Sequence, residues 1–333
     1  MMTRYETKKT IQAQAGMTLV ELMVALAIGS FLMIGTVQVY NQSRQAFVIN
    51  ESMARVQETA QFAMDTVEAD LRMASNWGLN SRGLAVEGRS IIGTANPTGL
   101  PAPAVCGATW ALNLAQPLVG SNNAYTLPCG ANGGAQANSD VITTRRATVA
   151  PSPLEAGRLQ IQTSRIQGEL FADGNVPVGF NVNPLLPPIS ETHNLLVNSY
   201  YVSASSALIP GVPTLRRKTL VGGGGGPAIV DQEVAPGVEN MQLQFGVDVN
   251  QDNTVDRYVN PGDPIFIPGD ALFIPGSRVI TARIWIVVRG LTPELGLVDT
   301  VNYQPGDVVL GVYNDSFRRM QVSKTILLRN ART

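Results

Sequence analysis

The sequence predicts an α+β fold in which one long N-terminal α-helix packs on a mostly antiparallel β-sheet head. An uncharged, largely apolar run extends from Leu22 to Ser43, which is long enough for a helix that crosses a membrane. Apolar residues then recur at steps of three and four from Val56 to Ala74, the period of an amphipathic helix. After Val141, apolar and polar residues alternate in several segments, as they do in half-buried strands.

The composition narrows the class of protein before any motif is considered. Of the 333 residues, 44% are hydrophobic, which is enough for a sizeable core. The formal net charge of −1 argues against a dedicated nucleic-acid binder, because such proteins usually carry a basic face. One His and two Cys leave little material for a zinc site.

The apolar run follows a polar and basic leader, residues 1–16, which ends in the small pair Ala15-Gly16. A secretory signal has the opposite order, since its cleavage site follows the apolar core. Cleavage after Gly16 would therefore leave the apolar helix on the mature protein. We expect residues 17–40 to cross the membrane, with the basic leader on the cytoplasmic side.

Glu21 is a carboxylate at the beginning of this apolar helix. A charge there costs on the order of 2.5–3.5 kcal/mol near the bilayer centre, and less toward the end of the span. One interpretation is that Glu21 snorkels to the lipid headgroups. The other is functional: cleavage after Gly16 would give Met17 a new α-amino group, and this cation and the carboxylate would share one apolar surface.

This segment resembles the type IV prepilin family, whose signature is a short basic leader ending in Gly, then an apolar helix with Thr second and Glu fifth. The matching residues are Gly16, Thr18, Leu19, Glu21 and Leu22, with Met17 in place of the more usual Phe. The resemblance implies a pilin-like fold, cleavage after Gly16 by the prepilin peptidase and N-methylation of Met17. It also implies that Glu21 pairs with the N-terminal amine of a neighbouring subunit and sets the register during assembly.

Two further features narrow the resemblance. Major pilins usually carry a helix-bending Pro deep in the apolar segment, where this sequence has Gln38, so a minor pilin or pseudopilin is indicated. The late segments ARIWIVVRG and VSKTILLRNART, with the Asp-rich turn after MQLQFGVDV, are similar to PilW-type minor pilins, relatives of the J-type pseudopilin of type II secretion. This second resemblance implies an assembly role with other minor pilins at the filament tip.

The helix is predicted to continue beyond the membrane, over residues 17–75 in total, and to stop at Asn76-Trp77-Gly78, where Gly can adopt a left-handed cap. The face expected to pack on the head comprises Val56, Ala60, Ala63, Val67, Leu71 and Ala74, and the opposite face carries Arg55, Glu58, Asp65 and Glu68. The alternative is two helices broken near 41–43.

Residues 76–140 are rich in Gly, Ala, Asn and Pro, and they form a predicted loop-rich insertion that contains Cys106 and Cys129. In an oxidising compartment these two cysteines are expected to form a disulfide, worth ~3 kcal/mol in the chain-entropy model. The alternative is a pair of free buried thiols.

Residues 141–333 form the predicted β-rich head. Gly222–Gly226 is expected to be a turn rather than a phosphate cradle, since the Lys-Ser/Thr end of a P-loop is missing. The predicted strands are 158–164, 195–203, 214–221, 241–247, 280–288 and 317–329.

An Asp- and Asn-rich segment of the head is a candidate calcium loop. Its oxygen side chains at positions one, three, five and nine of an EF-hand-like loop, with a backbone carbonyl at seven, come from Asp248, Asn250, Asp252, Asp256 and Thr254 respectively. Position six is Asn253 rather than Gly, and position twelve is Val259, which lacks the usual carboxylate. The alternative, weighed equally, is a hairpin turn without an ion.

The sequence contains few of the motifs that would indicate an enzyme. His193 is the single His, expected at the surface, and no G-x-S-x-G elbow occurs. The cluster Arg216-Arg217-Lys218 is expected to be a solvated strand edge rather than a DNA-binding stripe. We predict no catalytic residues, no required cofactor, Ca²⁺ as the one candidate ligand, and no nucleic-acid partner.

The sequence therefore predicts a non-enzymatic minor type IV pilin that is needed for pilus assembly. Expected partners are the prepilin peptidase, other minor and major pilins, the inner-membrane pilus assembly machinery and membrane lipid. The expected location is the inner membrane, with a single span and a periplasmic head, and then the pilus at the cell surface. The alternatives are a type II secretion pseudopilin and a membrane-anchored, calcium-dependent adhesin.

Overall fold

The computed structural model describes residues 16–90, 100–101, 103, 106–180 and 190–332. The chain divides into two compact units, Met1–Glu51 and Ser52–Thr333. The long helix α1 (Leu19–Met73) contributes to both units, and each unit is described by itself below.

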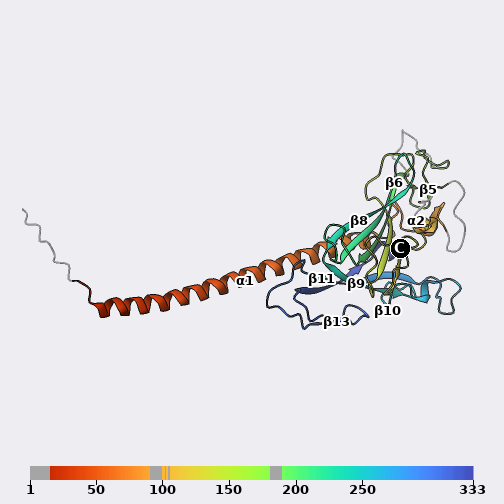
Figure 1. Ribbon diagram of the computed structural model, residues 1–333. Helices are drawn as coiled ribbons and strands as arrows, with labels where there is room; N and C mark the ends of the chain where they lie inside the picture. The colour runs from red at the N-terminus through yellow and green to blue at the C-terminus, as the bar shows by residue number, and fades with distance from the viewer. Residues whose placement is uncertain (1–15, 91–99, 102, 104–105, 181–189, 333) are drawn as a thin grey trace, which may run out of the picture. The chain divides into compact units, whose positions relative to one another are not determined.

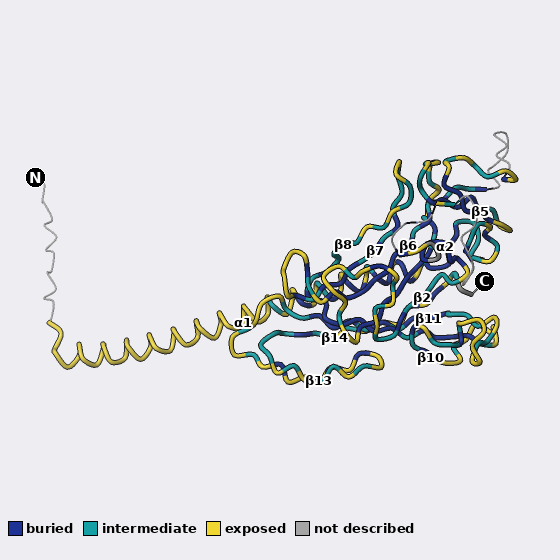
Figure 2. The backbone as a smooth tube through the Cα atoms, turned by 45° about the vertical axis from the view of Figure 1, so that its right-hand side comes forward, coloured by how far each residue is buried: buried dark blue, intermediate teal, exposed yellow. Residues whose placement is uncertain are grey.

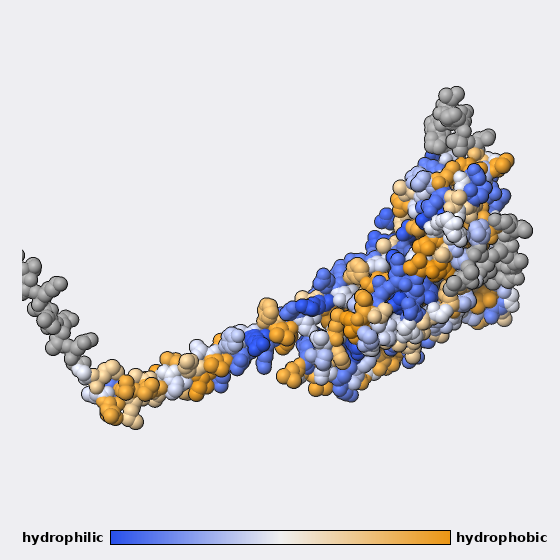
Figure 3. All heavy atoms as spheres, turned by 45° about the horizontal axis from the view of Figure 1, so that its top comes forward, coloured by the Kyte–Doolittle hydropathy of each residue, from blue (hydrophilic) through white to orange (hydrophobic). Residues whose placement is uncertain are grey.

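In the first unit, apolar residues of α1 lie on the surface (Figure 3), and every described residue of this unit is exposed (Figure 2). By length and composition, α1 is the one helix in the described part of the chain that could cross a membrane, and none of its apolar window is buried. The predicted continuous helix is observed, and the alternative of two helices broken near residues 41–43 is wrong, because α1 is helical throughout. The helix also ends two residues earlier than predicted, and Ser75, with φ of 66°, takes the left-handed conformation just after it.

The second unit contains an eight-stranded sheet and a four-stranded sheet (Figure 1). The eight-stranded sheet is antiparallel except for the pairing of β1 with β5. Its order is β1 (Val86–Glu87), β5 (Gly168–Phe171), β4 (Gln160–Thr163), β6 (Glu191–Ser203), β3 (Val141–Ala147) and β2 (Leu118–Ser121), with β7 (Thr214–Val221) paired to β6 and β8 (Ala228–Pro236) paired to β7.

The four-stranded sheet is antiparallel throughout. Its order is β10 (Arg257–Val259), β9 (Val238–Asp248), β11 (Arg278–Arg289) and β14 (Arg319–Leu327). The smaller elements are the pair β12 (Asn302–Tyr303) and β13 (Gly311–Val312), the helix α2 (Ala108–Leu112), and the 3₁₀ turns η1 (Gly83–Ala85), η2 (Pro264–Phe266) and η3 (Arg329–Arg332). The α+β fold is thus confirmed, and the six predicted strands correspond to β4, β6, β7, β9, β11 and β14.

The larger core lies between α1 and the strands of both sheets. All six residues predicted to form the inner face of the helix are buried, which confirms that interpretation of the period. The prediction for Glu68 is wrong, because this residue is buried: its carboxylate contacts Lys324 of β14 and Arg72 one turn further along the helix. The two cations compensate the Glu68 carboxylate, so it can be buried although the hydrophobic periodicity of the helix places it on the exposed face.

A second core joins the segment 76–140 to strands β4 and β6. Trp77, Trp110 and Leu112 are buried in it together with Ile161 and Leu195. Cys106 and Cys129, both buried, form a disulfide within this core. The loop-rich segment therefore belongs to the same compact unit as the strands, although a boundary at residue 141 was predicted from composition.

Candidate assembly site at the start of the helix

The start of α1 is a reciprocal capping arrangement between Thr18 and Glu21. Thr18 precedes the first helical residue, and its backbone N–H and its hydroxyl each donate a hydrogen bond to Glu21 Oε2, both at 3.0 Å. In return, the backbone N–H of Glu21 donates to Thr18 Oγ1 at 3.3 Å. This is a capping box, in which the N-cap residue and the third helical residue satisfy each other's free N–H groups.

The capping box brings together the carboxylate and the chain end that processing would create. Thr18 and Glu21 both follow Gly16, so cleavage there would leave the box intact. Gly16 itself is exposed, and no heavy atom lies within 4 Å of the position that a Cβ would occupy. In the described part of the chain, Glu21 has no cationic partner. The carboxylate is thus oriented by neutral donors only, and it can still accept a cation.

The sequence contains the signal for this box, T-x-x-E ahead of an apolar run, although the prediction above assigned Glu21 only an intermolecular role. The two roles are compatible, because a carboxylate has several lone pairs and the box engages one oxygen.

Two family models match the chain, one over the start of the helix and one over the sheet-rich unit. The family model of the prokaryotic N-terminal methylation motif matches residues 11–37, and the model of the type IV pilus-assembly protein W (PilW) matches residues 199–330. Together these two matches support a type IV pilin of the PilW type.

Among solved structures, the chain is similar to a type IV-like pilin from Thermus thermophilus. The sequence identity is 14% and the TM-score is 0.28, over 64% of this chain and 84% of that chain. No curated protein matches the chain. The methylation motif and the apolar helix indicate a membrane-anchored pilin, and the family is one of structural subunits that assemble with other pilins.

In the second unit, buried polar contacts hold the C-terminal part of α1 to the eight-stranded sheet. Asp70 accepts hydrogen bonds from Tyr200 Oη and Asn198 Nδ2, both at 2.6 Å, and it forms an ion pair with Arg146 at 2.9 Å. Burial, with the neighbouring Asp70 as a second cause, raises the pKa of Tyr200 above its ordinary value. The phenol therefore remains a donor, and Asp70 of α1 is held by residues of β3 and β6 that follow it by more than 70 residues.

The candidate calcium loop is well formed, but its first carboxylate is already neutralised. Asp248 is buried and pairs with Arg278 at 2.9 Å, and it accepts the backbone N–H groups of Asp252 at 3.2 Å and Asn253 at 2.9 Å. Burial alone would raise the pKa of Asp248, but these donors outweigh it and hold that pKa below its ordinary value. Asn253, which takes the place of Gly at position six, adopts the left-handed conformation, with φ of 67°.

The remaining oxygens of this loop accept hydrogen bonds from the loop itself. The amide oxygen of Asn250 accepts a hydrogen bond from the backbone N–H of Asp252. The Asp252 carboxylate in turn accepts from the backbone N–H and the hydroxyl of Thr254. The Asp256 carboxylate accepts from the backbone N–H of Val249. In the described part of the chain, no three His, Cys, Asp or Glu side chains form a group that could hold a metal ion. The loop would have to exchange these hydrogen bonds for ion contacts, so calcium binding stays a prediction.

Two surface predictions are wrong. His193 is 1% exposed, and its Nδ1 lies 2.8 Å from the Thr148 carbonyl oxygen, since β6 passes through the interior at this point. Arg216 and Lys218 are also buried, because β7 is flanked by β6 and β8 rather than lying at an edge, and both pair with Asp231 of β8. Neither site gathers the groups of a catalytic triad or presents a basic stripe.

Proposed function

We propose that this PilW-type pilin is a minor pilin whose leader is removed after Gly16 and whose Glu21 carboxylate guides its entry into the filament. The capping box at Thr18 and Glu21 carries the proposal. It holds a carboxylate at the first turn of an exposed apolar helix, next to the residue that would become the new N-terminus. The match to the methylation motif over residues 11–37 supports the same assignment.

The mechanism follows from the energetics of a charge in a membrane. Before assembly, the bilayer solvates the apolar side chains of α1 but not the carboxylate. Processing after Gly16, with N-methylation of Met17, creates an ammonium group at the end of the helix. Docking is favoured where the Glu21 carboxylate of this subunit meets the ammonium group of a neighbour, because the ion pair offsets the cost of desolvation.

The apolar helix then exchanges lipid for the helices of other pilins. Close packing of apolar side chains, rather than release of water, is expected to drive this step. The sheet-rich unit remains outside the bilayer, where it contacts the corresponding units of neighbouring subunits. The protein has no catalytic step of its own in this scheme, and it acts as a structural subunit in the initiation of the pilus.

Three variants separate the capping role from the charge. Thr18→Ala removes half of the box and keeps the charge, Glu21→Gln keeps an acceptor oxygen and removes the charge, and Glu21→Ala removes both. If the charge guides docking, both Glu21 variants insert into the membrane but lower the pilus number at least tenfold, whereas Thr18→Ala stays near wild type. Normal pilus numbers in Glu21→Gln would contradict the docking role.

Mass spectrometry of the mature chain tests the processing step directly. We expect the first residue to be Met17, carrying one N-methyl group. A mature chain that still begins with the leader, or that begins after the apolar helix, would contradict the proposal. Rescue of twitching motility in a deletion strain would distinguish a pilus subunit from a type II secretion pseudopilin.

A further inference from the structure

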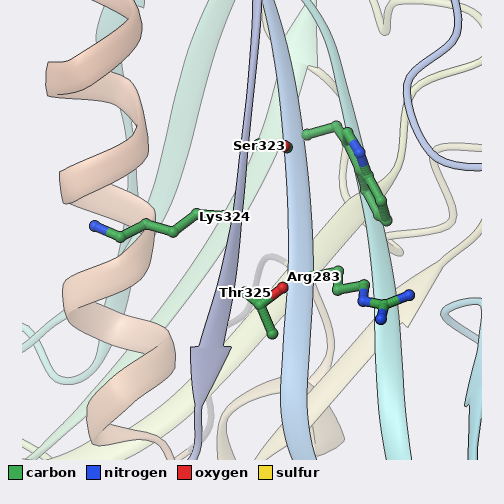
Figure 4. A pocket seen from close by; sticks show the side chains of 5 residues that line it. Arg283, Ser323, Lys324 and Thr325 are labelled. Atoms are coloured by element: carbon green, nitrogen blue, oxygen red, sulfur yellow. The ribbon is translucent and has the colours of Figure 1, made fainter.

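Strand β14 is a long, regular strand with an open edge. It pairs with β11 over nine residues without a register shift, and it is the last strand of its sheet. In the described part of the chain, no second strand pairs with it. Proteins usually protect such edges with Pro, bulges or outward charges. Strand β14 contains no Pro, and Lys324 is the one charged residue between its two ends. The Lys324 side chain points to the helix (Figure 4).

The register identifies which backbone groups are open. The Leu328 N–H donates to the Ile280 carbonyl at 2.9 Å, and the Gly290 N–H donates to the Arg318 carbonyl at 2.7 Å. In an antiparallel ladder, residues alternate between pairs that exchange hydrogen bonds and pairs that do not. The even-numbered residues of β14 therefore bond to β11, and the odd-numbered ones direct N–H and C=O away from it. These are Gln321, Ser323, Thr325 and Leu327, all exposed.

One shallow hollow lies at this edge, and another lies on the helix that Lys324 contacts. One, of about 280 Å³, is lined by Arg283, Trp285, Ser323, Lys324 and Thr325. The other, of about 460 Å³, lies on the exposed face of α1 and is lined by Ala54, Gln57, Glu58, Gln61, Phe62 and Asp65. Lys324 connects them, since its Nζ contacts Glu68 and lies 4.0 Å from Asp65. An incoming strand would thus have one hollow for each of its two faces.

The hollow on the helix is acidic and apolar. Glu58 has no ion pair among the described residues, and the single cation near Asp65 is Lys324, which already contacts Glu68. Phe62 is 55% exposed between these two carboxylates along the helix. A matching strand therefore carries a Lys or Arg and an apolar side chain on the face that it turns to α1.

We propose that β14 is a docking edge for an extended strand of another pilin subunit, which adds to the four-stranded sheet by backbone hydrogen bonds. This inference rests on the proposed function and names its contact surface. Main-chain hydrogen bonds provide the affinity in such strand addition, and the side-chain hollows provide the specificity. A second copy of this chain fits less well: its open edge β8 carries Asp231 and Glu233 and no basic residue, and the Lys324 of its β14 already contacts its own Glu68.

The sharpest test is Thr325→Pro, made in the full chain and in cells that contain the other pilins. The Thr325 N–H points to the open edge, so Pro removes no hydrogen bond to β11, and it blocks the approach of a strand. Thr325→Val keeps the N–H and is the matched control. A photo-reactive residue at Ser323 captures the partner for mass spectrometry, and Glu58→Gln combined with Asp65→Asn tests the charge.

We expect Thr325→Pro to reduce crosslinking to another pilin at least tenfold, with Thr325→Val unchanged and the paired charge variants intermediate. The crosslinked peptide should be an extended segment that contains a Lys or Arg. Undiminished crosslinking in Thr325→Pro, in a protein with unchanged thermal stability, would overturn the docking edge, and crosslinks only to a second copy would overturn the assigned partner. If deletion of the whole chain leaves the pilus number unchanged, the proposed function fails instead.

Discussion

A buried carboxylate predicts how the stability of the sheet-rich unit depends on pH. Asp140 is fully buried at the beginning of β3, where its two oxygens accept the backbone N–H groups of Asn123 at 2.8 Å and Leu243 at 2.7 Å. Burial raises the pKa of Asp140 to about 7, with repulsion from Asp307 as a further cause, although the two N–H donors oppose the shift.

The sign follows from proton linkage. A carboxyl group with a raised pKa binds its proton more tightly in the folded state than in the unfolded state, so the free energy of unfolding falls as the pH rises from about 4 to about 7. Each pKa unit corresponds to about 1.4 kcal/mol. Between pH 5 and pH 8, ionisation of Asp140 should therefore remove about 3 kcal/mol of stability.

The substitution Asp140→Asn tests this value. Asn cannot ionise, and its NH₂ group replaces one acceptor, so the stability of the variant should lack this pH-dependent part and should lie about 1–3 kcal/mol below that of the wild type at pH 5, where Asp140 is protonated. Denaturant unfolding of the full chain in detergent at pH 5, 6, 7 and 8 gives the difference between wild type and variant as a function of pH. The exposed Asp173→Asn serves as a control: the Asn175 N–H lowers the pKa of Asp173, so this carboxyl is ionised in the folded and unfolded states throughout pH 5–8, and the variant's curve should run parallel to that of the wild type. Parallel wild-type and Asp140→Asn curves would refute the reasoning.

Two further predictions concern the disulfide and the calcium loop. Replacing Cys106 and Cys129 together by Ser should lower the free energy of unfolding by about 3 kcal/mol, measured by denaturant titration, and a change well below 1 kcal/mol would show that the second core holds this segment without the bond. If the Asp248 loop binds calcium, a Ca²⁺ concentration 100 times the Kd should stabilise the wild type by about 2.7 kcal/mol relative to EDTA, and Asp252→Asn should lose this response. A wild type that is indifferent to millimolar Ca²⁺ would favour the simple hairpin turn.

The positions of the strands could be predicted well, because each depends on a local alternation of apolar and polar residues. Strand β7 was predicted with its observed bounds, and β9, β11 and β14 differ by only a few residues. Strand β8 was missed, since its alternation includes Asp231 and Glu233, whose role depends on the cations of the neighbouring strand.

The candidate assembly site was predictable in a different sense. Gly16, Met17 and Glu21 were identified from a resemblance, and the spacing of Thr18 and Glu21 follows a local rule that needs no tertiary information. The open edge of β14 could not be predicted from the sequence, because which strand lies at an edge depends on the order of the strands in the folded sheet.

The sequence alone determined the apolar helix, the amphipathic face of α1, the capping-box spacing and the resemblance to type IV pilins, because each depends on a few helical turns or one short motif. Tertiary structure decided which charged side chains are buried. Glu68, Asp70 and Arg216 are polar by composition, yet they are buried, since partners from distant segments neutralise them. The physical reason is that the free energy of burying a charge depends on what lies opposite it, which only the folded chain specifies.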